Sequence, residues 1–407
     1  MISLRQNEKW WVLGMLWVVC FLNYADRQAM SSLFPLLERE FGFSKAELGL
    51  IGSAFMWVYA FSSPLLGFAG DRKSRKGLVV AGCLLWSLMT GFTGFCAKLW
   101  QFVAARSLIG LGESVYFPSA TSILSDYHHR TRSTALSLHQ SAVYLGTIAG
   151  GWIAALIAEH YGWRWAFYGF GAAGLLVALM IGLCLREPAR DKIIAADTQP
   201  GVLVTLSNLM KLPGVFLLML AFACANGVGA IFLVWAPTFL FEKFHLSLVM
   251  AGFSAVAAIQ LASALSAPLS GLLADRFARK IKGAHMLIQA GALTGGALAV
   301  AAVGHAPTMS LLIGAMICFG LCKGAYDGGI FASVFDLVPP PERASTAGLM
   351  NMLGWGGGAL GPLSIGLISA FGHGTAMERM SAGISWSGVA YLVAAGLIFT
   401  AWRIRRL

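Results

Sequence analysis

Hydrophobic residues along this chain of 407 residues fall into long runs, separated by short polar segments. A helix of about 20 apolar residues spans the hydrocarbon core of a bilayer. We therefore predict an all-α membrane protein with twelve transmembrane helices, whose boundaries are good to a few residues. These helices are expected at 10–34, 47–69, 77–96, 99–124, 133–157, 163–184, 214–240, 249–270, 284–303, 308–335, 344–370 and 381–402.

A polar loop sequence occurs twice, once in each half of the chain. Residues 67–76 read Gly-x-x-x-Asp-Arg-x-x-Arg-Lys, and residues 271–280 repeat this pattern. Two shorter echoes lie at nearly the same offset, and one of them links Glu113-Ser-Val-Tyr116 with Lys323-Gly-Ala-Tyr326. Parallel repeats of this kind build many secondary transporters. We expect two pseudo-symmetric six-helix bundles at 1–184 and 213–407, joined by a cytoplasmic linker at 185–212.

The repeated loop has a predicted role in gating. Its glycine would let helices approach closely, its aspartate would pair or cap at a helix end, and its basic residues would keep the loop cytoplasmic. The alternative is that the basic residues are topology signals only. The predicted gating residues are Gly67, Asp71, Arg72, Arg75, Gly271, Asp275, Arg276 and Arg279.

Charge and composition narrow the class of protein. Only 12% of the residues are charged, against about 25% in soluble domains, and 57% are hydrophobic. The net charge of +11 reflects topology rather than nucleic acid, because most lysines and arginines fall in loops on one side. This bias predicts a multi-pass protein of a bacterial-type cytoplasmic membrane, with both termini cytoplasmic. The chain is expected to work as a monomer in the lipid bilayer.

Ionisable residues occur inside the predicted helices. Each would cost about 2.5–3.5 kcal/mol at the centre of a bilayer helix, so these residues must pair or face a wet cavity between helices. Both outcomes indicate a polar path through the membrane. The residues are Asp26, Arg27, Arg106, Glu113, Lys323 and Asp327.

Spacing indicates which of these charges can meet. Asp26 and Arg27 are adjacent and point about 100° apart on a helix, so they cannot simply neutralise each other. If Arg27 leaves to bind an anion, the carboxylate can take a proton, although a static ion pair with another helix is the alternative. Arg106 and Glu113 are seven residues apart in one predicted helix. They therefore share a face of it but lie roughly 10 Å apart along its axis. Lys323 and Asp327 are four apart and can pair within one helix. Both are also candidate substrate-binding residues, and Lys323 could contact a substrate anion or Glu113.

Further polar and aromatic residues could line the same path. Each also has a purely structural interpretation, as a packing aromatic or a satisfied core group. Pro237 in the seventh helix and the glycine-rich eleventh helix suit bending and close packing. The candidate substrate-binding residues beyond the charged ones are Tyr24, Tyr59, Tyr116, His139, Gln140, Asn226, Trp235, Tyr326 and Asn351.

Several classes of function are disfavoured by the motifs that the chain lacks. It contains no zinc-protease, serine-hydrolase or P-loop motif, so we expect neither an enzyme nor an ATP-driven pump. A dinucleotide-like glycine pattern at 169–174 lies inside an apolar run with no preceding strand. The seven cysteines all fall in apolar spans and are interpreted as small buried residues without a disulfide framework. No cofactor or metal is expected, and a proton gradient is the expected energy source.

The repeated loop resembles the signature of the major facilitator superfamily, and the resemblance covers the whole chain. The stretch Arg106-Ser-Leu-Ile-Gly-Leu-Gly112 is similar to that superfamily's fourth-helix motif, whose arginine is usually tied to proton coupling. The fifth helix at 146–151 lacks the proline-bearing pattern of drug–proton antiporters, which weakens an interpretation as a drug exporter. The resemblance implies the major facilitator fold and alternating access.

Two branches of the superfamily compete. The stretches 23–27, 53–59 and 235–238 resemble anion:cation symporters, which take up sugar acids and other carboxylates with protons. On that resemblance Arg27 binds the carboxylate, while Asp26 and Glu113 carry protons and Arg106, Tyr24 and Tyr59 support them. The stretches 110–113 and 159–167 resemble spinster-type proteins, which are linked to lysophospholipids and sphingolipids. We narrowly favour a proton-coupled transporter of a small organic anion. Among the alternatives outside these branches, passive facilitation is closer to this interpretation than a membrane enzyme.

Overall fold

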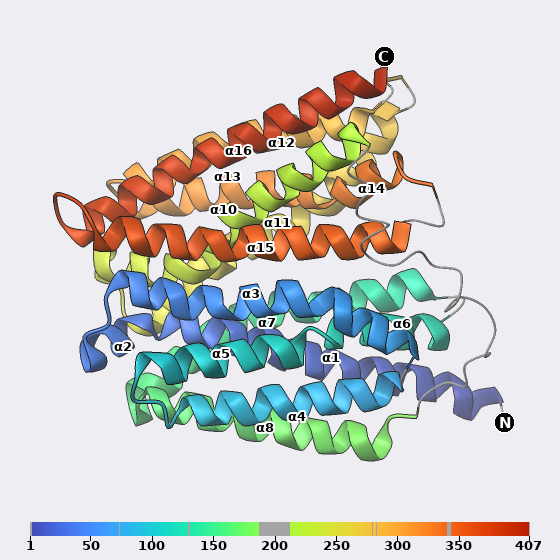
Figure 1. Ribbon diagram of the computed structural model, residues 1–407, viewed down its shortest axis with the longest axis horizontal. Coiled ribbons are helices and arrows are strands. Elements are labelled where there is room, and N and C mark those ends of the chain that lie inside the picture. Colours follow the sequence, from blue (N-terminus) through green and yellow to red (C-terminus); the bar gives the residue numbers. More distant parts are fainter. Residues whose placement is uncertain are drawn as a thin grey trace. The chain divides into compact units, whose positions relative to one another are not determined.

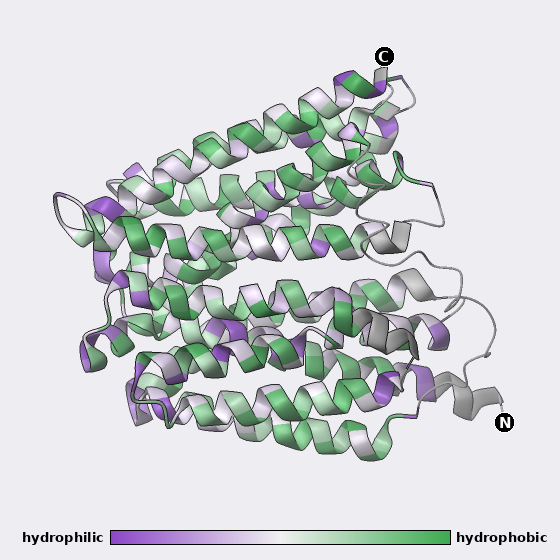
Figure 2. Cartoon of the chain, in the orientation of Figure 1, coloured by the Kyte–Doolittle hydropathy of each residue, from purple (hydrophilic) through white to green (hydrophobic). Residues whose placement is uncertain are grey.

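A computed structural model describes the chain at residues 2–72, 74–128, 131–186, 212–278, 280–281, 283–339 and 343–406. Every secondary-structure element in these ranges is a helix (Figure 1). Hydrophobic residues dominate along most of these helices (Figure 2). Nine helical segments among the described residues are long and apolar enough to cross a membrane. The predicted class of an all-α membrane protein is therefore confirmed.

The helices follow the predicted spans, with some differences in where they end. The first half contains α1 (Ile2–Ser32), α2 (Phe34–Phe41), α3 (Lys45–Arg72), α4 (Arg75–Thr93), α5 (Leu99–Glu113), α6 (Tyr116–Tyr127), α7 (Arg132–Tyr161) and α8 (Trp163–Cys184). The second half contains α10 (Pro213–Phe244), α11 (Leu248–Ala278), α12 (Ala284–His305), α13 (Met309–Asp327), α14 (Ile330–Phe335), α15 (Arg343–Ala370) and α16 (Ala376–Arg406).

Two predicted spans are broken, which the apolar pattern did not indicate. The span at 99–124 consists of α5 and α6, and the break falls directly after Glu113. Pro118 lies in the first turn of α6, and because a proline has no backbone N–H it cannot donate the hydrogen bond that would continue the helix across the break. The span at 308–335 consists of α13 and α14, which are separated by Gly328 and Gly329. Each break places a charged residue, Glu113 or Asp327, at the end of a helix.

The chain forms two compact units. The first comprises Met1–Gly42, Ala54–Gln199 and Ser247–Phe253, and the second comprises Phe43–Ser53, Pro200–Leu246 and Ser254–Leu407. Each unit thus includes one short segment from the other sequence repeat, at the start of α11 or of α3. Most of the predicted linker, residues 187–211, lies outside the described residues. The predicted boundaries of the two bundles stay a prediction.

Glycines bring helix backbones into contact within the first unit. Helix α1 packs along α7, and α4 packs along α8. A Cβ atom on Gly146 would lie 2.4 Å from the carbonyl oxygen of Phe21, and one on Gly150 would lie 2.4 Å from the backbone of Ala25. Small residues at such positions permit the van der Waals packing that holds helices together in lipid. Glycines of α7 therefore fix the position of α1 against it.

Glycines also position the two short segments, Ser247–Phe253 and Phe43–Ser53, that each unit includes from the other sequence repeat. In the first unit, a Cβ on Gly252 of α11 would lie 2.8 Å from the carbonyl oxygen of Gly151. In the second unit, a Cβ on Gly49 of α3 would lie 2.9 Å from the carbonyl oxygen of Pro362 in α15. The first turns of α11 and α3 are thus packed directly on the backbone of α7 and α15, respectively.

The cysteines are less uniformly buried than the sequence suggested. Cys20, Cys83 and Cys96 are buried, whereas Cys184 and Cys318 are exposed. All seven are free thiols. A small apolar side chain is equally suited to the core and to a surface that faces lipid, which explains why the apolar pattern did not separate the two positions.

We expect Gly150→Ala to destabilise the protein, because its Cβ would meet the α1 backbone at Ala25. Overpacking of this kind typically costs about 1–3 kcal/mol. The matched control is Gly169→Ala in α8, where a Cβ meets nothing within 4 Å. That change should leave stability unchanged or raise it by about 0.5–1 kcal/mol. Thermal unfolding of the purified protein in detergent measures both, and equal midpoints would contradict the close packing of α1 on α7.

Candidate functional site

A cluster of buried charges lies in the first unit, among α1, α3, α4 and α5. The central interaction joins Arg27 of α1 to Glu113 at the end of α5, with Arg27 Nε donating to Glu113 Oε2 at 2.5 Å. The side chain of Glu113 is fully buried and that of Arg27 is 12% exposed. Arg27 therefore pairs with a carboxylate that comes from another helix.

Aromatic rings surround the Arg27 guanidinium. Its central carbon lies 4.4 Å from the ring centroid of Tyr24, 4.7 Å from that of Phe55 and 5.1 Å from that of Tyr59. Such contacts attract a cation to the negative ring face, and more strongly where water is excluded. Tyr24 and Tyr59 were predicted site residues, and the structure brings both to Arg27.

Phe55 is a site residue that the sequence reasoning missed. Its ring also lies 4.9 Å from the guanidinium carbon of Arg106, so it contacts both arginines of the cluster. The motif at 53–59 contained this residue, but a phenylalanine in an apolar helix is indistinguishable from a packing residue by sequence. The position of Phe55 lets two like charges share one aromatic ring within the unit.

Asp26 is the second acid of the cluster. It is 3% exposed, and its Oδ2 accepts a hydrogen bond from Thr90 Oγ1 of α4 at 3.3 Å. Its Oδ1 has no hydrogen-bond partner among the described residues. A buried carboxyl with one oxygen that lacks a donor is suited to bind a proton, because an ionised carboxylate there is poorly solvated.

Arg106 completes the cluster. It is 4% exposed, and its Nε has no acceptor in the part of the chain that the structure describes. The two arginines and the two acids balance to zero net charge when all four are ionised. Balanced charge is the condition under which several ionisable groups can be buried together.

Tyr116 and His139 form a separate polar pair in the first unit. The Tyr116 hydroxyl donates to the carbonyl oxygen of Leu16 at 2.5 Å and lies 2.8 Å from His139 Nε2. Both side chains are buried. This pair joins α6 and α7 to α1, as the structural interpretation of a satisfied histidine expects. The neighbouring Gln140 is partly exposed.

The predicted site residues of the second unit do not gather into a comparable cluster. Lys323 and Asp327 form the predicted ion pair within α13, with side chains 25% and 41% exposed. Asn226 donates to the carbonyl oxygen of Phe222 in its own helix at 2.9 Å. Trp235 Nε1 donates to the carbonyl oxygen of Pro362 at 2.9 Å. These two side chains therefore satisfy the backbone.

Two further candidates of the second unit differ in their surroundings. Asn351 is exposed. Tyr326 is buried, and its hydroxyl has no partner among the described residues. A site role for Tyr326 thus keeps a chemical basis, whereas nothing around Asn351 distinguishes it from a surface residue.

The structure describes the side chains of only some of the predicted gating residues. Arg75 pairs with Asp126 at 2.6 Å and donates to Ser122 at 2.6 Å, which ties the start of α4 to α6. A Cβ on Gly271 would meet nothing within 4 Å, so the close helix approach expected there is absent. Arg276 is exposed. Arg279 and the side chains of Gly67, Asp71, Arg72 and Asp275 lie outside the described residues.

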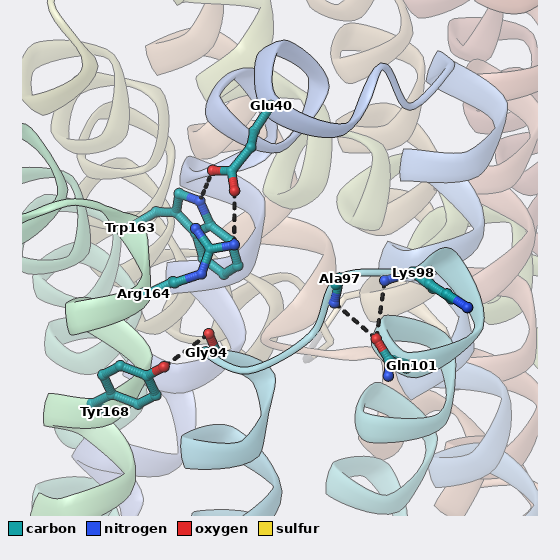
Figure 3. Close-up of polar contacts among 8 residues, drawn as sticks. All are labelled: Glu40, Gly94, Ala97, Lys98, Gln101, Trp163, Arg164 and Tyr168. Atoms are coloured by element: carbon teal, nitrogen blue, oxygen red, sulfur yellow. Dashed lines mark hydrogen bonds and ion pairs between the residues drawn. The ribbon is translucent and has the colours of Figure 1, made fainter.

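A polar network holds α2 to the α7–α8 junction (Figure 3). Glu40 accepts hydrogen bonds from Trp163 Nε1 at 2.6 Å and from Arg164 Nη2 at 2.7 Å. The Arg164 guanidinium, and to a lesser extent the Trp163 indole, lower the pKa of the Glu40 carboxyl. Glu40 belongs to α2, which is not one of the candidate membrane spans, and its contact with the start of α8 fixes the end of the α1–α2 arm.

The start of α5 is fixed in the same region (Figure 3). Gln101 Oε1 accepts from the backbone N–H groups of Ala97 and Lys98 at 2.8 and 3.0 Å. Tyr168 of α8 donates to the carbonyl oxygen of Gly94 at 3.0 Å. The two Gln101 contacts satisfy backbone donors at the start of α5, and the Tyr168 contact satisfies a backbone acceptor at the end of α4. They anchor the helix that presents Arg106 and Glu113.

The arrangement suits ion and proton exchange rather than covalent catalysis. Within the described residues, no three histidine, cysteine, aspartate or glutamate side chains lie together as a metal site would require. The buried groups are two permanent cations and two acids, one of which is held by an arginine. Such a cluster can bind an anion and release or take up a proton.

Comparison with known proteins places the chain in a family. The family model of the Major Facilitator Superfamily matches residues 16–362 and, in a second match, 254–406. The chloroplastic ascorbate transporter of Arabidopsis thaliana is 26% identical over 392 residues, which cover 90% of this chain and 72% of that protein. The probable galactarate/D-glucarate transporter GudP of Escherichia coli is 24% identical over 405 residues, covering 90% and 88%.

A solved structure shares the fold. It is a bacterial homolog of the human lysosomal transporter Spinster, in an inward-facing and occupied conformation. The TM-score is 0.82 at 22% identity, and the match covers 97% of this chain and 96% of that one. The predicted fold class is confirmed by this likeness. The chain belongs to the Major Facilitator Superfamily, as a multi-pass membrane transporter and not an enzyme.

Proposed function

We propose that this protein is a proton-coupled transporter of a small organic anion. The observation that carries the proposal is the buried ion pair between Arg27 and Glu113, set in a cluster with zero net charge. The names of the relatives, which include an ascorbate transporter and a probable galactarate/D-glucarate transporter, support an organic acid as the substrate.

Coupling follows from the cost of leaving a buried charge without its partner. An anion that binds Arg27 competes with the carboxylate of Glu113 for the same guanidinium. An ionised Glu113 without that partner is strongly disfavoured in a buried site, so it takes up a proton. The anion and the proton then enter together, and the cluster keeps its net charge.

Asp26 provides a second place for a proton. Its unpaired oxygen and its single long hydrogen bond from Thr90 leave its ionised form poorly stabilised. Arg106 keeps its charge throughout, because a guanidinium does not lose its proton in proteins. In this mechanism Arg106 stabilises whichever acid is ionised, and Phe55 with the two tyrosines keeps Arg27 in position between events.

The proposed setting follows from the distribution of charge. The excess of lysine and arginine in loops on one side supports a cytoplasmic membrane with both termini in the cytoplasm. The likeness to a transporter of Escherichia coli supports a bacterial inner membrane. We infer that a single chain suffices and that the proton gradient is the energy source, without a further cofactor.

We expect Asp26→Asn and Glu113→Gln to abolish accumulation driven by a pH gradient while leaving exchange intact. Neither amide can carry the coupled proton, but anion binding at Arg27 does not need it. The measurement is uptake of radiolabelled D-glucarate into proteoliposomes, with an imposed gradient and, separately, in counterflow.

The matched control for that experiment is Glu378→Gln. Glu378 is an exposed acid in the first turn of α16, so its replacement should accumulate the label like the unmodified protein. Accumulation against a gradient by both acid variants would contradict the coupling role. Passive facilitation predicts equal behaviour of all variants with and without the gradient.

We expect the single variant Arg27→Gln to lose about 3–5 kcal/mol of stability at pH 8, because Glu113 must then stay ionised without a partner or take up a proton at a pH far above the ordinary range of a glutamate. The double variant Arg27→Gln/Glu113→Gln has no unpaired charge and should recover most of this loss, while transport stays absent. Chemical or thermal unfolding of the four proteins of this cycle gives the coupling energy. Additive losses would show that the two side chains do not form an energetically important pair.

A further inference from the structure

The hydroxyl of Thr90 bonds differently from most threonine hydroxyls within the helices of this protein. Thr90 lies in α4, is 2% exposed, and donates to Asp26 Oδ2 of α1 at 3.3 Å. A threonine within a helix commonly bonds the carbonyl oxygen four residues earlier in the same helix. The hydroxyls that do so here belong to Thr93, Thr121, Thr147, Thr294 and Thr400. Thr90 instead gives its hydrogen to a buried acid of another helix.

This contact is the only side-chain hydrogen bond that Asp26 makes with the described residues. The side chain of Asp26 is 3% exposed, and its Oδ1 has no partner there. A hydroxyl that donates to an ionised carboxylate makes a stronger hydrogen bond than one that donates to a neutral acid. Thr90 therefore affects the balance between the two protonation states of Asp26.

Glycine contacts hold α4 on both sides of Thr90. A Cβ on Gly171 of α8 would lie 2.6 Å from the backbone nitrogen of Gly91, the residue that follows Thr90. A Cβ on Gly82, earlier in α4, would lie 2.5 Å from the carbonyl oxygen of Gly112 in α5. Such backbone contacts leave little room for the helix to shift. The helix thus presents the Thr90 hydroxyl from a fixed position.

Other ionisable groups also face Asp26, and they are the same in every variant of Thr90. These groups are Arg27 of α1, Cys83 of α4, and Arg106 and Glu113 of α5. Helix α7 approaches this part of α1 through Gly150, and α8 has no ionisable residue between 169 and 183. Exchange of the Thr90 hydroxyl for a methyl group changes none of these charges. A change in the titration of Asp26 can therefore be assigned to the lost donor.

We propose that Thr90 is a positioning residue that sets the affinity of Asp26 for a proton. Its hydroxyl stabilises the ionised carboxylate, so that Asp26 releases its proton at a lower pH than burial alone would allow. The inference rests on the proposed proton coupling, because that coupling makes the proton affinity of Asp26 matter for transport. It gives a part in proton exchange to α4, which carried no predicted proton-coupling or substrate-binding residue.

The test is an infrared titration of the protonated carboxyl band of the purified full chain in liposomes. The variant Asp26→Asn identifies the part of this band that belongs to Asp26. Thr90→Val keeps the shape of the side chain but removes the donor, and it should raise the midpoint of the Asp26 titration by about one pH unit. Thr90→Ser retains a hydroxyl and should restore the midpoint of the unmodified protein.

The matched control is Thr93→Val. Thr93 lies in the next turn of α4, is fully buried, and donates to the carbonyl oxygen of Met89 in its own helix at 2.8 Å. Its replacement removes the same atoms at similar burial but takes no donor from Asp26. The midpoint should therefore stay within about 0.2 pH units of that of the unmodified protein. Thermal unfolding establishes that each variant is folded before its titration is compared.

Uptake of radiolabelled D-glucarate connects the titration to transport. In Thr90→Val, gradient-driven uptake should be half-maximal at a higher pH, because Asp26 then keeps its proton to a higher pH. The shift should match that of the infrared titration, and Thr93→Val should show none. A merely structural role of Thr90 would lower uptake at every pH without moving this profile.

Several results would overturn the proposal. These are an unchanged midpoint in the folded Thr90→Val variant, an equal shift in Thr93→Val, and failure of Thr90→Ser to restore the midpoint. The absence of an Asp26 titration at any pH at which the protein stays folded would also overturn it. Uptake by the unmodified protein that is independent of the gradient would instead overturn the proposed coupling, whereas the infrared titration would still measure the effect of Thr90 on Asp26.

Discussion

An ionised side chain in the apolar interior of a membrane protein needs a partner, and the first unit is organised around this requirement. Arg27 and Glu113 come from helices far apart in sequence, and their contact commits α1 and α5 to one relative rotation. The break after Glu113 places its carboxylate at a helix end, close to the guanidinium. The surrounding rings of Tyr24, Phe55 and Tyr59 exclude water, which strengthens the pair and raises the cost of breaking it.

That contact in turn depends on glycine. Helices in lipid have little hydrophobic driving force to associate, so close van der Waals packing must position them. Gly146 and Gly150 of α7 contact the backbone of α1 at Phe21 and Ala25, which precede Arg27 in the same helix. At the other end, the hydrogen bonds of Glu40 with Trp163 and Arg164 hold the arm that continues α1. Packing and polar anchoring thus set the geometry in which charge exchange is possible.

Periodicity and spacing predicted much of this molecule, and their limits are physical. Long apolar runs located the helices, and the spacing of four residues correctly predicted the pair of Lys323 with Asp327, because both lie on one helix. The pair of Arg27 with Glu113 was out of reach, because no local pattern fixes the rotation of one helix against another. Phe55 was missed for a related reason, since an aromatic side chain in an apolar helix can be recognised as a site residue only from the groups it contacts. The break in the fourth span was hidden by an apolar run that continues through it.

The two units use the common repeat for different chemistry. The first buries four charges that balance, and any anion that enters must be matched by a proton if the balance is to persist. The second keeps its ion pair of Lys323 with Asp327 partly exposed. A partly exposed ion pair tolerates the loss of one partner better than a fully buried one, because water can solvate the charge that remains. The polar residues of the second unit are therefore less constrained than the acids and arginines of the first.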